Sequence, residues 1–139
     1  MMIKNTESGY LELAHTADWA LKVWAPDLTG MFAQAAQGMY ALMGVTLGDA
    51  PCTDRRVEVS GQDAEVLLVS FLEELLYLAE MQQEGFSRFD VRIGAGQLTA
   101  DLCGAPIREQ EKQIKAVTYH GLQIKQTPQG LETVIVFDV

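Results

Sequence analysis

The last six residues, 134–139, form an apolar run that a folded chain has to bury. They are mostly β-branched or aromatic, which favours strands, so this run predicts a β-strand in the core. One carboxylate interrupts the run at Asp138, and the carboxylate of Val139 lies beside it. Two negative groups at the tip of an apolar strand are costly unless a cation, a proton or hydrogen-bond donors compensate them. The sequence therefore predicts that other polar groups meet this strand end.

Length and composition predict one globular domain, residues 1–139. Of the 139 residues, 48% are hydrophobic and 21% are charged, so the chain can bury a core. No apolar run approaches the roughly 18 residues of a membrane span, and the polar start of the chain lacks the apolar segment of a signal peptide. Cys52 and Cys103 have neither metal-ligand spacing nor the number typical of a disulfide framework. They predict free thiols and a cytoplasmic location.

The charge balance bears on the kind of partner. Ten Lys and Arg residues against 19 Asp and Glu residues give a formal net charge of −9. Most of such a surface repels a phosphate backbone, so we do not expect direct RNA binding. The balance is compatible with cation binding, with docking to a basic partner, or with solubility alone.

Two segments repeat apolar side chains at the spacing of one helix face. The first spans residues 28–43, where Asp27 is suited to cap the start and Gly44 the end. The second spans about residues 64–83 and follows Asp63, another residue suited to an N-cap. Four glutamates lie mostly off the second apolar face: Glu65, Glu73, Glu74 and Glu80. We interpret them as a solvated face, with a docking surface as the alternative.

The remaining patterns predict strands. Alternating or apolar runs occupy residues 10–14, 19–24, 55–60, 86–93, 97–103, 119–126 and 131–139. Residues 45–54 and 104–113 carry prolines and polar side chains and are predicted to be loops. The order of the elements predicts an α+β fold, with mixed or antiparallel sheet layers packed with two main helices.

Carboxylates near the two ends of the chain are candidates for a cation site. His15 and Asp18 are three residues apart in the turn between the first two predicted strands, so both could face one pocket. Asp18, Asp138 and the Val139 carboxylate together would form an all-oxygen site. Such a site suits Ca²⁺ or Mg²⁺ rather than zinc, which prefers nitrogen and sulfur. Spacing alone does not show that these groups meet.

Two further residues could carry chemistry. Lys115 lies in a mostly apolar stretch, where its ammonium group either reaches solvent or points at an anion. His120 enters a predicted strand and is interpreted as a structural histidine. The sequence has no nucleophile paired with a base in a recognisable motif and no phosphate-cradling loop. The chain therefore lacks the usual parts of an enzyme.

Four segments, taken in order, resemble the archease family. They are HTAD at residues 15–18, the helical residues 67–78, IKAVTYH at residues 114–120, and the ending at residues 134–139. The match runs through almost the whole chain, and the elements are specific in combination although each alone is weak. Many archeases have an Ile-Gly-type pair where this chain has Trp19 and Ala20. That difference should alter packing beside the site more than its charge.

The resemblance implies a small α+β sandwich and a cofactor protein rather than a catalyst. Archeases assist the tRNA-splicing RNA ligase, which joins RNA ends with GTP and divalent metal, by promoting guanylylation of its histidine and multiple turnover. The family's metal-binding acids correspond to Asp18 and Asp138, with the Val139 carboxylate as a further ligand for Ca²⁺, Mg²⁺ or Mn²⁺. A functional lysine corresponds to Lys115, which is expected with His15 to face the partner or its nucleotide.

Two other functions stay open. The first is a chaperone or specificity modulator of a tRNA or RNA methyltransferase, acting through shape and acidic surface. The second is a small metal-dependent hydrolase, with His15 as the base beside a cation at Asp18 and Asp138. The sequence shows no nucleophile or leaving-group acid for such a hydrolase.

Overall fold

The computed structural model describes residues 7–13, 18–49 and 51–139. Its strands are β1 (Gly9–Leu13), β2 (Trp19–Ala25), β3 (Thr46–Leu47), β4 (Thr53–Ser60), β5 (Glu84–Gly94), β6 (Gln97–Glu109), β7 (Ala116–Val117), β8 (Lys125–Thr127) and β9 (Gly130–Asp138). Its helices are α1 (Leu28–Met43) and α2 (Ala64–Gln82). The fold is α+β, as the sequence predicts.

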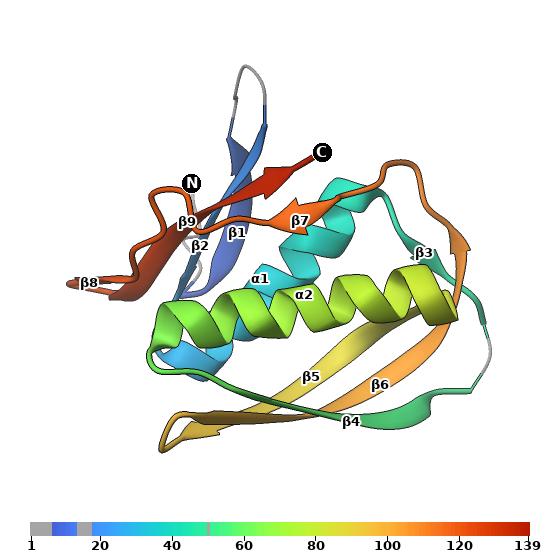
Figure 1. The fold of residues 1–139 in the computed structure, drawn as a ribbon, viewed down its shortest axis with the longest axis horizontal. Coiled ribbons are helices and arrows are strands. Elements are labelled where there is room, and N and C mark those ends of the chain that lie inside the picture. Colours follow the sequence, from blue (N-terminus) through green and yellow to red (C-terminus); the bar gives the residue numbers. More distant parts are fainter. Residues whose placement is uncertain (1–6, 14–17, 50) are drawn as a thin grey trace.

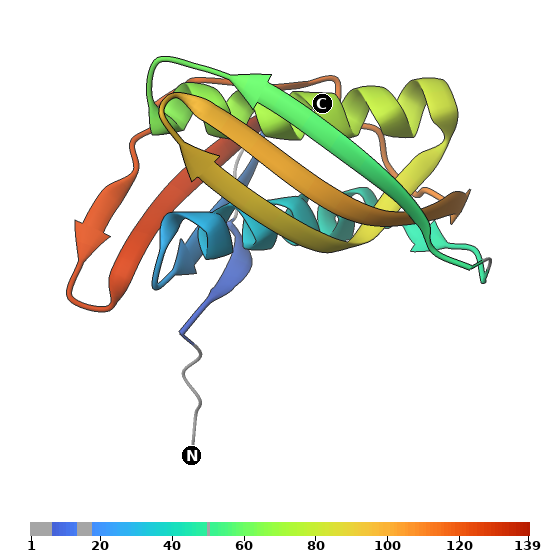
Figure 2. The ribbon, with the colours of Figure 1, turned by 90° about the horizontal axis from the view of Figure 1, so that it is seen from below.

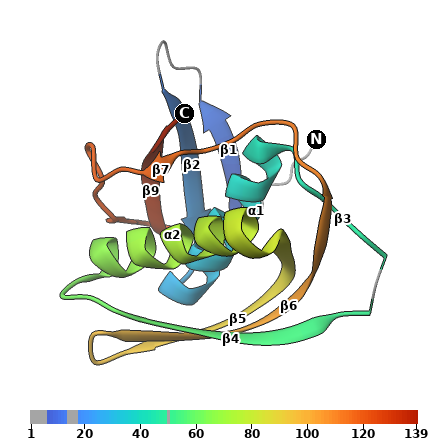
Figure 3. The ribbon, with the colours of Figure 1, turned by 45° about the vertical axis from the view of Figure 1, so that its right-hand side comes forward.

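The strands form two antiparallel sheets. In the first sheet β1, β2, β9 and β7 lie in that order, and β8 also pairs with β9. In the second sheet β6 pairs with β3, β4 and β5. Both helices lie between the two sheets (Figures 1 and 3). Figure 2 shows the long strands β4, β6 and β5 side by side in front of the helices. Each sheet therefore turns one face toward the helices and the other outward.

Both helices begin at the caps that the sequence indicates. The Asp27 carboxylate accepts a hydrogen bond from Gly30 N at 2.8 Å. The Asp63 carboxylate accepts one from Val66 N at 2.9 Å. These bonds satisfy N–H groups that the first helical turn leaves without a partner. At the end of α1, Gly44 takes the left-handed conformation, with a φ of 65°, that residues with a Cβ rarely adopt.

The core lies where the helices meet the inner faces of the sheets. Phe32 of α1 and Phe71 of α2 stack with their ring centres 6.1 Å apart. In β9, Ile135 and Phe137 are fully buried, so the C-terminal run is a core strand as predicted. Asp138 follows them and is exposed, because successive residues of a strand face opposite sides of the sheet.

The second sheet is longer than the sequence predicts. Residues 45–54 contain β3 and the start of β4, and residues 104–113 contain the last part of β6, so the prediction of two loops is wrong. Pro106 lies within β6 although it has no N–H to donate. The next N–H, that of Ile107, donates to Gln83 O at 2.7 Å and keeps the strand attached. Pairing with neighbouring strands therefore overrides the polar, turn-like composition.

Cys52 and Cys103 form a disulfide, so the prediction of free thiols is wrong. Their Cα atoms are 5.3 Å apart, although the two residues are separated by 51 positions. The start of β4 pairs with β6, with Thr53 opposite Gly104, and this pairing brings the two cysteines together. A cytoplasmic location can no longer be argued from free thiols.

Candidate functional site

One end of the first sheet brings together three distant parts of the chain. In β2 and β9, Trp19 lies opposite Phe137. The same register continued by one residue sets Asp18 opposite Asp138. On the other side of β9, Ala116 of β7 lies opposite Asp138. Figure 1 shows the end of β9, with the C-terminus, between β2 and β7. The sheet therefore places the start of β2, which follows Asp18, beside the end of β9, an arrangement that sequence spacing cannot show.

Asp138 is held through its main chain and exposed through its side chain. Its carbonyl oxygen accepts a hydrogen bond from Lys115 N at 2.8 Å. Because water reaches the exposed carboxylate, the cost expected for an acid buried at the end of an apolar strand does not arise. Val139 is half-buried and packs against the core, which fixes the chain next to its carboxylate. We call Asp18, Asp138 and the Val139 carboxylate the acidic tip.

The donors of the acidic tip fit a hard cation in kind. They are all carboxylate oxygens, the ligands that Ca²⁺ and Mg²⁺ prefer. Within residues 7–13, 18–49 and 51–139, no three His, Cys, Asp or Glu side chains are grouped as metal ligands. The tip offers two such side chains, and the Val139 carboxylate would be the third protein ligand. A metal at the tip remains a prediction. His15 lies outside the described residues.

The segment after β6 carries the other predicted residues. The Lys115 side chain is exposed, the outcome expected for a lysine that reaches solvent from an apolar stretch. Its neighbour Ile114 is only 5% exposed and belongs to the core, which holds this segment in place. His120, interpreted as a structural histidine, instead lies exposed in a turn, where its main-chain N–H donates to Thr118 Oγ1 at 3.2 Å.

Two glutamates of α2 hold the segment around β7. Glu73 Oε2 accepts a hydrogen bond from Val117 N at 2.7 Å. Glu65 Oε2 accepts one from Ile124 N at 3.0 Å. The interpretation of the four α2 glutamates as a solvated face is therefore incomplete: Glu73 is exposed, yet it and Glu65 also hold main-chain N–H groups of this segment. Their spacing of about two helical turns places them on one side of α2, and this is the signal that the sequence offered.

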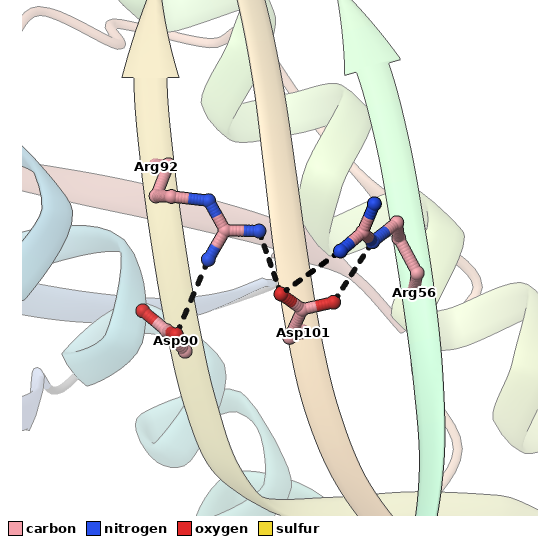
Figure 4. A network of polar contacts seen from close by, with 4 residues as sticks. All are labelled: Arg56, Asp90, Arg92 and Asp101. Carbon is pink, nitrogen blue, oxygen red and sulfur yellow. Dashed lines mark hydrogen bonds and ion pairs between the residues drawn. The ribbon is translucent and has the colours of Figure 1, made fainter.

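The outer face of the second sheet carries a network of arginines and aspartates (Figure 4). Asp101 accepts hydrogen bonds from Arg56 Nε at 2.9 Å and from Arg92 Nη2 at 2.6 Å. Arg92 also donates to Asp90 at 3.2 Å. The hydrogen bonds from Arg56 and then Arg92 lower the pKa of Asp101, and the bond to Asp101 raises the pKa of Arg56. Because acids alternate with the arginines, this is a mixed-charge face stabilised by cross-strand pairs rather than a basic one.

The architecture and the candidate site together define a class of protein. Two antiparallel sheets enclose two helices, and the polar groups that the fold brings together at the end of the first sheet are carboxylates and a lysine-bearing segment. None of the helices in the described part of the chain is long and apolar enough to cross a membrane. The chain is thus an α+β protein whose candidate site is an acidic sheet end.

Comparison with known proteins gives the family. The Archease protein family (MTH1598/TM1083) matches residues 10–139. Protein archease of Thermococcus kodakarensis is 36% identical over 124 residues, which cover 84% of this chain and 87% of that protein. Protein archease of Methanosarcina barkeri is 32% identical over 139 residues, which cover 94% of this chain and 95% of that protein. The chain therefore belongs to the archease family.

Two solved structures share the fold. The solution structure of Methanobacterium thermoautotrophicum protein 1598 has a TM-score of 0.74 and is 26% identical in sequence. The match covers 96% of this chain and 100% of that protein. The crystal structure of an archease from Thermotoga maritima, described as a possible chaperone, has a TM-score of 0.69. The match covers 100% of this chain and 98% of the Thermotoga maritima chain. Because the two sequences are 21% identical, this likeness supports the fold alone.

Proposed function

We propose that this protein is an accessory activator of the tRNA-splicing RNA ligase, promoting guanylylation of the ligase histidine and multiple turnover, and is not itself an enzyme. Membership of the archease family supports this proposal. The observation that carries it is the register of the first sheet, which sets Asp18 opposite Asp138 when continued by one residue. Lys115 is fastened to the same strand end by its N–H group. The resemblance assigns these three residues to metal binding and to contact with the partner.

The acidic tip would hold a divalent cation through the oxygens of Asp18, Asp138 and Val139. A bound Ca²⁺, Mg²⁺ or Mn²⁺ would supply positive charge that offsets the phosphates of the GTP used by the ligase. Hard cations take about six or more oxygen ligands, so the tip leaves positions for water or for groups of the partner. The exposed ammonium group of Lys115 would face the nucleotide or an acidic group of the ligase, and His15 is assigned to the same side.

A multiple-turnover ligation assay with the purified ligase tests this function. Asp18→Asn and Asp138→Asn each remove a charge with little change in side-chain shape, so both should abolish stimulation while the fold is kept. Glu132→Gln is the matched control, since Glu132 also lies in β9 but pairs with Trp24 far from the tip. Full stimulation by both aspartate variants would show that the tip does not act.

The role of the Val139 carboxylate can be tested separately. A short extension beyond Val139 moves the terminal carboxylate away from the strand end without altering Asp18 or Asp138. We expect a weaker affinity for Ca²⁺ in a calorimetric titration, because an oxygen donor has been removed. An unchanged affinity would show that Val139 is not a ligand.

A second candidate function is a chaperone or specificity modulator of an RNA methyltransferase. The Thermotoga maritima archease is itself described as a possible chaperone. Under this alternative, co-purification should recover a methyltransferase, and adding the protein should change methylation specificity. The ligation assay separates the two functions, because a methyltransferase partner predicts no effect on ligase turnover.

A further inference from the structure

The segment between β6 and β7, residues 110–115, leads from the second sheet to the acidic tip, and we call it the strap. It leaves β6, passes the end of α1 and enters β7 (Figures 1 and 3). At its start, the N–H groups of Glu111 and Lys112 donate to Met43 O at 2.9 Å and 3.0 Å. At its end, the Lys115 N–H donates to Asp138 O at 2.8 Å. The main chain of the strap is thus fastened both to α1 and to the tip.

The Lys112 side chain makes a further contact. Its Nζ lies 4.8 Å from the centre of the Trp19 ring, within the range of a cation–π interaction. Trp19 is half-buried, and its main chain is held in β2 opposite Phe137. Trp19 also directly follows Asp18 in the chain. The contact therefore ties the strap to the strand that carries one carboxylate of the tip.

The start of the strap lies close against the end of α1. A Cβ added at Gly44, beyond the end of α1, would lie 2.8 Å from the side chain of Glu111. Further along, Ile114 is 5% exposed and is held in the core. The position of Lys115 along the strap depends on these contacts. The exposed side chain of Lys112 adds a contact between the strap and β2.

We propose that Lys112 is a positioning residue that, stacked on Trp19, sets the strap so that Lys115 is presented beside Asp138. This inference rests on the proposed function, since Lys115 is assigned its role at the tip. Lys112 acts through Lys115 and through the geometry of the strap. A general effect of its positive charge is the alternative, and it makes a different prediction, because charge would act whether or not the Trp19 ring is present.

Substitutions on both sides of the contact separate stacking from charge. Lys112→Met keeps an alkyl chain and removes the cation, and Trp19→Leu keeps the cation and removes the ring. Either change should reduce ligase stimulation by about two- to fivefold, the factor expected for loss of one exposed cation–π contact. Lys112→Arg should restore stimulation, because a guanidinium group also stacks on an indole. Lys125→Met, at an exposed lysine of β8, is the control and should have no effect.

A double-mutant cycle tests whether Lys112 acts through Lys115. If it does, Lys112→Met combined with Lys115→Met should stimulate no less than Lys115→Met alone. A readout that does not need the ligase is amide exchange at Lys115, whose N–H is bound to Asp138 O and should exchange faster in the Lys112→Met variant. With Trp24→Phe as background, Trp19 is the remaining tryptophan of the two in the chain, and its emission should shift when Lys112 is replaced.

Three results would overturn the inference: full stimulation by Lys112→Met, effects of Lys112→Met and Lys115→Met that simply multiply, or an unchanged Trp19 emission. Its failure can be told apart from failure of the proposed function. If Asp18→Asn abolishes stimulation while Lys112→Met does not reduce it, only the positioning role is wrong. If both aspartate variants of the tip stimulate fully, the proposed function is wrong, and the positioning role that rests on it is withdrawn as well.

Discussion

Replacing Glu73 tests how α2 supports the acidic tip. Glu73 Oε2 accepts a hydrogen bond from Val117 N at 2.7 Å, and Val117 belongs to β7, which pairs with the end of β9. Glu73→Ala removes the acceptor and leaves the N–H of a residue that is 6% exposed without this bond. The expected result is a less stable protein in which β7 opens more often.

The size of the effect follows from the type of bond. A hydrogen bond to a charged group contributes about 1.5–3 kcal/mol. Because Glu73 is exposed and water competes for its carboxylate, the low end, about 1.5 kcal/mol, is the appropriate figure. For a chain of 139 residues this corresponds to a fall in the unfolding midpoint of about 5 °C. Glu73→Gln keeps an uncharged acceptor and should lose about half as much.

Urea unfolding followed by circular dichroism measures the change, and amide exchange at Val117 measures local opening of β7. Glu80→Ala is the matched control, because Glu80 is exposed on the same helix and the substitution has the same effect on helix propensity. The reasoning is refuted if Glu73→Ala is as stable as Glu80→Ala and the Val117 amide exchanges no faster.

Two other predictions concern the second sheet and the end of α1. Asp101→Asn should lower the free energy of unfolding at neutral pH, because hydrogen bonding from Arg56 lowers the folded pKa of Asp101 below its ordinary 3.8. This stabilisation is complete above pH 3.8 and is lost as the pH falls through the pKa of Asp101 in the folded protein. Denaturant titrations should therefore show that the stability difference between Asp101→Asn and the parent disappears in acid. Gly44→Ala should lose about 1–2 kcal/mol in thermal unfolding, because the residue has a φ of 65° and a Cβ would crowd Glu111. A Gly44→Ala variant as stable as the parent would contradict this.

The candidate site was only partly predictable. The sequence marks Asp138 as an acid at the end of an apolar strand, but it does not show that the side chain is exposed. The alternation of the strand decides this, since Phe137 faces the core and Asp138 faces the other way. The expected approach of Asp18 to Asp138 depends on pairing between the second strand of the chain and the last one. No local pattern specifies which strands pair.

The sequence by itself determined the two helices, their N-caps and the C-cap of α1, because helical hydrogen bonds and cap contacts join residues only three or four positions apart. The helix at Leu28–Met43, the cap at Asp27 and the left-handed Gly44 are all of this kind. The tertiary structure decided the contacts between distant residues. Glu73 binds the N–H of a residue 44 positions away, and Cys52 meets Cys103 across 51 positions. Packing of the sheets and helices selects such partners, so only the folded chain shows what surrounds the acidic tip.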